Sequence, residues 1–73
     1  MREKIIETLA QVMNQDANTF FDETVITEIE GFDSLRFVMM ISELQENYNI
    51  EIPLDKALEV KTVGDLIASA KFL

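Results

Sequence analysis

Two stretches in which apolar residues recur at helical spacing constrain the fold of this chain more than any other feature of its sequence. Within residues 3–13 the apolar side chains fall on one face of a helical wheel, and residues 34–48 continue the same kind of pattern for about four turns. The face of the first stretch consists of Ile5, Ile6, Leu9, Val12 and Met13. Because another element must cover such a stripe, we predict two amphipathic helices that pack together.

The rest of the chain predicts one further helix and one short one. Thr62 precedes another apolar stripe, and Asp65 three residues later can complete a capping box. Pro53 disfavours helix at the residue before it, so we expect a short helix only after it, within 54–60. The last stripe consists of Val63, Leu66, Ile67 and Ala70, and in the short helix we expect Leu54, Ala57 and Leu58 to point inward. The prediction is an all-α fold, a small bundle of three main helices plus one short helix.

The connection between the first two helices, residues 14–32, is polar and acidic. A loop this long is uncommon inside a small domain, and its apolar residues indicate that it packs over the helices, with Phe20 and Phe21 in the core. Residues 48–52 alternate polar and apolar side chains as a strand does. We predict no sheet, because a single strand has nothing to pair with.

Composition narrows the classes of function. The 73 residues carry a formal charge of -8, so nucleic acid and anionic membranes are poor partners and a basic protein surface is a better one. The chain lacks cysteine and histidine, which removes the thiol nucleophile and the usual base of a catalytic serine. The acidic segment from Asp16 lacks the glycine and the closing glutamate of a calcium loop. We expect a single domain over residues 1–73, a cytoplasmic monomer that is not an enzyme, binds no metal and does not insert into membranes.

The second predicted helix has apolar residues on two sides. Steps of 100° per residue gather one set into an arc that suits the core: Phe37, Met40, Ile41, Leu44 and Tyr48. Leu35, Val38 and Met39 fall outside that arc, with Glu46 beside them. We therefore predict an exposed apolar strip with acidic neighbours, as expected of a surface that binds another protein.

The start of this helix, Asp33-Ser34-Leu35, fits two registers. If Asp33 is the N-cap, Ser34 occupies the first helical position and its hydroxyl faces solvent. If Ser34 is itself the N-cap, the hydroxyl has a structural role only. The local residues leave both registers open and by themselves favour the second.

The wider pattern resembles the acyl carrier protein family. The resemblance rests on Gly31-Phe32-Asp33-Ser34-Leu35 at the start of a long helix, on Phe37 to Tyr48, on Ile50-Glu51-Ile52-Pro53 and on Thr62-Val63-Gly64-Asp65-Leu66, so it covers nearly the whole chain. It implies that Ser34 is the attachment point of a covalent phosphopantetheine arm, whose thiol carries acyl groups as thioesters.

The same resemblance implies partners and further site residues. The partners are a phosphopantetheinyl transferase and acyl-loading and acyl-transfer enzymes with basic docking surfaces. The matching recognition positions are Asp33, Leu35, Val38, Met39 and Glu46. For members that store the acyl chain between the second and third helices, the matching lining would be Leu44, Ile52, Ala57 and Val60.

Two departures bear on the pathway. Carriers of fatty-acid synthesis often have acidic residues where this chain has Arg36, Met39 and Gln45. Phe32 before Asp33 is similar to the aromatic residue found in carriers dedicated to particular pathways. We expect a free-standing carrier for polyketide, lipid or aminoacyl building blocks, with bulk fatty-acid synthesis still open. The alternative is an unmodified acidic interaction module with the same fold.

Overall fold

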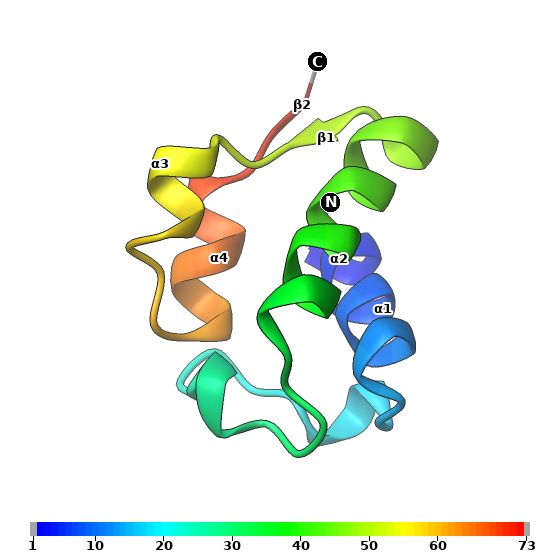
Figure 1. Ribbon diagram of the computed structural model, residues 1–73, viewed down its shortest axis with the longest axis vertical. Helices are drawn as coiled ribbons and strands as arrows, with labels where there is room; N and C mark the ends of the chain where they lie inside the picture. Colours follow the sequence, from blue (N-terminus) through cyan, green and yellow to red (C-terminus); the bar gives the residue numbers. More distant parts are fainter. Residues whose placement is uncertain (1, 73) are drawn as a thin grey trace.

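The computed structural model describes residues 2–72 and is a small helical bundle (Figure 1). Its helices are α1 (Arg2–Met13), α2 (Ser34–Tyr48), α3 (Leu54–Ala57) and α4 (Val63–Ser69), with two short 3₁₀ turns, η1 (Ala17–Thr19) and η2 (Ile26–Glu28), between α1 and α2. Helices α1 and α2 lie side by side, and α3 and α4 lie opposite them (Figure 1). The predicted arrangement of three main helices and one short helix is confirmed. No helix among these residues has the length and apolar character needed to cross a membrane.

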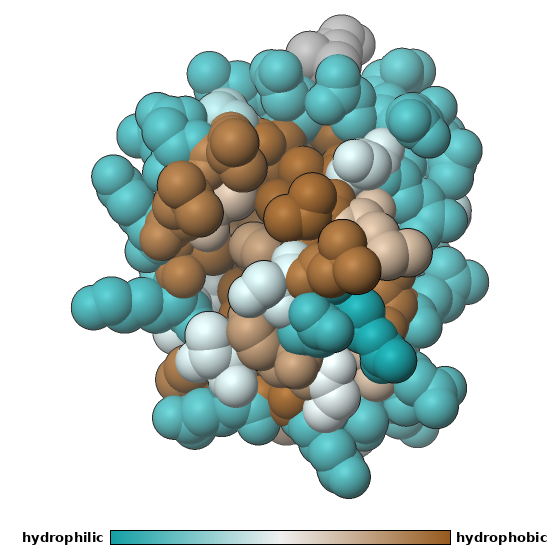
Figure 2. Space-filling model, in the orientation of Figure 1, coloured by the Kyte–Doolittle hydropathy of each residue, from teal (hydrophilic) through white to brown (hydrophobic). Residues whose placement is uncertain are grey.

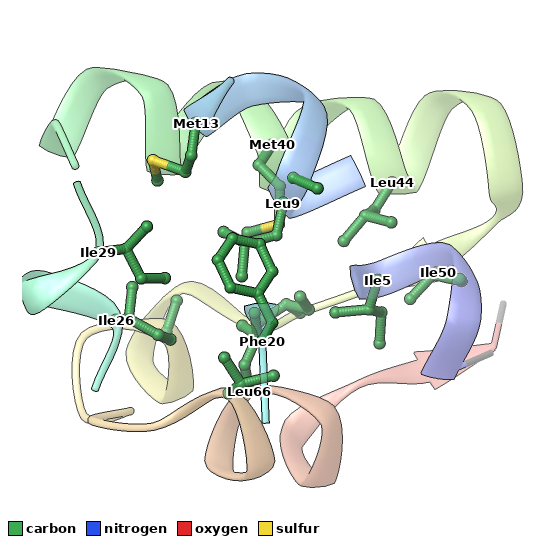
Figure 3. Packing of buried hydrophobic residues seen from close by; sticks show 14 residues of the cluster. Ile5, Leu9, Met13, Phe20, Ile26, Ile29, Met40, Leu44, Ile50 and Leu66 are labelled. Carbon is green, nitrogen blue, oxygen red and sulfur yellow. The ribbon is translucent and has the colours of Figure 1, made fainter. Parts of the chain in front are cut away.

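The core fills the space between the α1–α2 pair and α4 (Figure 3). Leu9, Met40, Leu44 and Leu66 are fully buried there, and Phe20 points into the middle of the cluster from the connection after α1. The predicted core face of α2 is therefore confirmed at its centre. It is wrong at Tyr48, whose side chain remains 37% exposed at the end of α2 and carries the Lys4 ammonium 5.3 Å above its ring.

The long connection is fastened to the start of α4 by backbone hydrogen bonds. The N–H groups of Val63 and Gly64 donate to the carbonyls of Thr24 and Asp22, and the N–H of Ile26 donates to Lys61, each over 2.9 Å. The prediction that this segment packs over the helices is confirmed. The prediction for Phe21 is wrong, because its side chain is 60% exposed while that of Phe20 is buried.

A two-stranded sheet closes the end of the molecule opposite the start of α2. Strand β1 (Ile50–Glu51) pairs antiparallel with β2 (Lys71–Phe72), with Ile50 opposite Phe72 and Glu51 opposite Lys71. The expectation of no sheet is therefore wrong. The partner strand lies 20 residues later in the sequence, and only the path of α3 and α4 brings it back alongside β1.

The short helix α3 differs most from its prediction. It ends at Ala57, which is buried, whereas Leu54 and Leu58 are 63% and 80% exposed. A helix of four residues has room for one inward position, and the small side chain of Ala57 takes it. The two leucines expected in the core therefore lie on the surface.

Helix α4 begins with the predicted capping box. The Asp65 N–H donates to the Thr62 hydroxyl over 3.1 Å, and the Asp65 carboxylate accepts from the N–H groups of Thr62 and Lys61, both over 3.2 Å. The N–H group of Lys61, followed by that of Thr62, holds the pKa of Asp65 below its usual value. The predicted inward stripe is fully buried at Val63 and Leu66 and half-buried at Ile67 and Ala70.

Candidate functional site

Ser34 occupies the first position of α2, and Asp33 is the N-cap. Asp33 has an extended backbone (φ -150°, ψ 134°), and its carboxylate accepts the N–H of Leu35 over 2.9 Å. The first of the two registers is therefore correct. The Ser34 side chain is exposed, and within residues 2–72 its hydroxyl makes no hydrogen bond. This hydroxyl is accessible to another molecule and has no capping role.

The turn before Ser34 is fixed by a glycine that no other residue could replace without strain. Gly31 has φ +87°, and a β-carbon added there would lie 2.9 Å from the carbonyl oxygen of Met13, the last residue of α1. The start of α2 therefore passes very close to the end of α1. This contact sets where Ser34 lies relative to the bundle.

Two phenylalanines on either side of Ser34 hold the start of α2. Phe32 precedes the N-cap and Phe37 lies in the first turn, with ring centroids 6.3 Å apart and a tilted geometry. This pairing is a hydrophobic staple, which fixes the angle at which the chain enters a helix. Ser34 is thus exposed but is carried on a well-anchored segment.

A mostly apolar hollow of about 220 Å³ opens beside Ser34. Side chains from η2, α2 and α3 surround it: Ile26, Thr27, Phe32, Phe37, Val38, Ala57 and Leu58. Of the four residues matched to an acyl lining, only Ala57 faces this hollow. Leu44 and Ile52 are buried in the closed core, and Val60 lines a separate hollow between α3 and α4.

Apolar side chains also gather on the surface formed by α2 and α3 (Figure 2). We call this surface the α2–α3 face, and its exposed apolar residues are Leu35, Val38, Met39, Leu54 and Leu58. The α2 members agree with the exposed strip that the wheel predicts. The sequence analysis missed Leu54 and Leu58. The one signal for their exposure was that a helix starting directly after Pro53 has to be short and can bury few side chains.

Acidic residues border this face. Asp33 and Glu46, both exposed, flank its α2 part, and Glu43 and Glu46 line a shallow groove of about 430 Å³ between α2 and Val12 of α1. Within residues 2–72 no three acidic side chains gather closely enough to hold a metal ion. Apolar contacts framed by carboxylates suit a protein surface with apolar and basic residues.

The residues around Ser34 can accommodate a phosphodiester. The first N–H groups of a helix have no partner within the helix, and they and the positive end of its dipole favour an anion. The Asp33 carboxylate accepts a hydrogen bond from one of these groups, the N–H of Leu35. An anionic group linked to the exposed Ser34 oxygen would lie at this end of the helix without displacing any buried side chain.

Comparison with protein families agrees with this geometry. The family model described as a phosphopantetheine attachment site matches residues 3–69. The acyl carrier protein of Tropheryma whipplei (strain Twist) is 31% identical over 71 residues, which covers 90% of this chain and 85% of that protein. The acyl carrier protein of Rickettsia canadensis (strain McKiel) is 32% identical, with coverage of 97% and 83%.

Comparison with solved structures gives the same result. A candidate acyl carrier protein from Mycobacterium tuberculosis superimposes with a TM-score of 0.78 at 32% sequence identity. The match covers 93% of this chain and 90% of that one. The likeness therefore extends over the whole bundle and is not confined to the segment around Ser34.

Proposed function

Because this chain belongs to the acyl carrier protein family, whose members are carriers with a covalent phosphopantetheine and not enzymes, we propose that Ser34 is the residue that bears the arm. The observation that carries the proposal is the exposed hydroxyl at the first position of α2, which makes no hydrogen bond to any residue in the range 2–72. The arm supplies the thiol that the chain itself lacks, and acyl groups are held on it as thioesters. The protein supplies a fixed attachment point and a surface for partner enzymes.

The attachment site is tested by modification with a phosphopantetheinyl transferase and coenzyme A. We expect the intact mass to rise by one arm, and Ser34→Ala to abolish the increase. Ser42→Ala is the matched control, because Ser42 is also exposed and lies two turns later on α2. This variant should be modified like the parent protein. Modification of Ser34→Ala would place the arm elsewhere.

We further propose that the α2–α3 face, with Asp33 and Glu46 at its border, receives the transferase and the acyl-handling enzymes. Its support is the five exposed apolar side chains of this face, of which Val38 and Leu58 line the hollow beside the candidate attachment point. Leu35→Asp should slow modification strongly while leaving the fold intact, since Leu35 is 67% exposed. If several transferases fail to modify the folded protein, the alternative of an unmodified interaction module is favoured.

The hollow beside Ser34 is a mostly apolar space next to the candidate attachment point, which the end of an arm that folds back could reach. We propose that Phe32, Phe37 and Ala57 shelter a short acyl group there. A longer chain would have to part α2 from α3 to reach Leu44 and Ile52, which are buried in the closed core. A loaded six-carbon acyl group should therefore shift the side-chain NMR signals of Phe37 and Ala57 more than those of Ile52.

For the pathway, we propose dedicated biosynthesis of a polyketide, lipid or aminoacyl product in the cytoplasm. The support is the sparse acidic character of α2, where Glu43 and Glu46 are the only carboxylates, together with the aromatic Phe32 directly before Asp33. Intact mass of the protein from its native host identifies the carried group. One discrete acyl or aminoacyl group is expected, and a series of chains that differ by two-carbon units would instead indicate fatty-acid synthesis.

A further inference from the structure

Arg36 is the only basic residue between Lys4 and Lys56, a stretch that contains eleven aspartates and glutamates. It lies two residues after Ser34 on α2, directly after Leu35 of the α2–α3 face. Residues two apart on a helix do not face each other, and the Arg36 side chain reaches toward Val12 of α1. A single positive charge therefore lies in the first turn of α2, on the side next to α1, in the part of the chain that is otherwise most acidic.

Among residues 2–72 this charge has no carboxylate partner. Within residues 2–72 the ion pairs are Arg2 with Asp22 and Lys4 with Glu7, and no acidic group lies within 4.0 Å of the Arg36 guanidinium. Among the described residues its side chain makes one hydrogen bond, of 3.5 Å, from Nη1 to the carbonyl oxygen of Val12 near the end of α1. This distance is at the limit for a hydrogen bond, and the side chain is exposed.

We infer that Arg36 is a selectivity residue: it weakens docking to uniformly basic enzyme surfaces and favours a partner that places a carboxylate opposite it. Such a partner would also carry basic residues to meet Asp33 and Glu46. Charges at the border of an interface mainly control which partners associate and how fast, and like charges brought together are unfavourable. Positive and negative charges along α2 therefore select an enzyme surface with the opposite arrangement of charges.

The inference rests on the proposed attachment at Ser34, and transferase kinetics test the two separately. The probe is a phosphopantetheinyl transferase with a basic carrier-binding surface, and the quantity measured is kcat/KM for the parent, Arg36→Gln and Arg36→Glu. We expect Arg36→Glu to raise kcat/KM about three- to tenfold at low salt, with Arg36→Gln between the two. The gain should vanish near 1 M salt, where the Debye length is about 3 Å.

Lys71→Glu is the matched control for net charge. Lys71 is exposed in β2, which pairs with β1 at the far end of α2 from Ser34, so the same charge change there should alter kcat/KM less than twofold. Equal effects of the two substitutions, or a lower kcat/KM for Arg36→Glu, would overturn the inference. Absence of modification in the parent protein would instead count against the attachment at Ser34.

A structural role for Arg36 gives a different result. If its main role is the bond to Val12 at the end of α1, Arg36→Gln and Arg36→Glu would both lower the melting temperature and slow modification. That outcome also overturns the inference.

Charge exchange tests the predicted partner directly. Since the chain has no cysteine, Arg36→Cys gives a unique thiol for cross-linking, which locates the transferase residue opposite position 36. The inference predicts that this transferase residue is basic, and that its replacement by glutamate favours the parent carrier and disfavours Arg36→Glu. Additive effects of the two charge reversals, without coupling, would contradict the inference.

Discussion

The capping role of Asp33 gives a prediction in which fold and function can be separated. In Asp33→Ala the N–H of Leu35 loses the carboxylate that now accepts its hydrogen bond over 2.9 Å. Removal of an N-cap costs about 1 kcal/mol, because water replaces the lost acceptor only in part. For a domain of this size, that corresponds to a fall in melting temperature of about 4–8 °C.

Asp33→Asn is the matched variant, because asparagine retains a side-chain oxygen and caps helices about as well as aspartate. We expect its free energy of unfolding to stay within about 0.5 kcal/mol of the parent value, since only the favourable charge at the helix start is lost. The assay is urea unfolding followed by circular dichroism, with an unchanged denaturant slope showing that the two-state transition is preserved.

The transferase reaction then reports on Ser34. Asp33→Ala should lower kcat/KM because the first turn of α2 frays and the serine is presented less often in its helical geometry. Asp33→Asn should lower it only to the extent that a basic residue on the enzyme contacts the carboxylate. If Asp33→Asn were as destabilising as Asp33→Ala, the side-chain oxygen would not be the cap and the account of Ser34 given above would be refuted.

Two further predictions concern the bundle itself. Leu44→Ala should destabilise the protein by about 2–5 kcal/mol in urea unfolding because Leu44 is fully buried, whereas Leu58→Ala, at an 80% exposed position, should change the free energy of unfolding by less than about 0.5 kcal/mol; equal losses would contradict the assigned core. The lowered pKa of Asp65 means that its ionised form stabilises the fold at neutral pH, and that this contribution is lost as the pH falls below its usual value of 3.8 and through the lowered value. The difference in unfolding free energy between the parent and Asp65→Asn should therefore shrink in acid. A difference that stays constant down to complete protonation would show that the Asp65 charge does not contribute to stability.

Local patterns in the sequence were sufficient for the extent of α2 and for the cap that begins α4. Helix α2 spans the predicted 34–48, and the capping box of Thr62 and Asp65 forms as its spacing indicates. These features depend on residues that lie within a few positions of one another, and the apolar period by itself separates Met40 and Leu44 from Leu35 and Met39. The exposed strip on α2 was predictable for the same reason.

The register at Ser34 lay between these cases. The sequence offered two N-caps, and local residues favoured the serine. The structure selects Asp33 because Gly31 lies against the end of α1 and Phe32 packs on Phe37, which together fix the angle at which the chain enters the helix. The competing registers differ by one residue, so contacts outside the helix decide between them.

Features that only the tertiary structure decided all depend on residues distant in sequence. The pairing of Ile50 with Phe72 requires the whole path of α3 and α4, and Leu58 is exposed because a helix of one turn buries only Ala57. Likewise, the sequence shows that Arg36 is the one basic residue in a long acidic stretch, but only the fold leaves it without a carboxylate partner among residues 2–72. Helical period and capping are local and can be read from the sequence, whereas which surface stays uncovered is set by the packing of the entire chain.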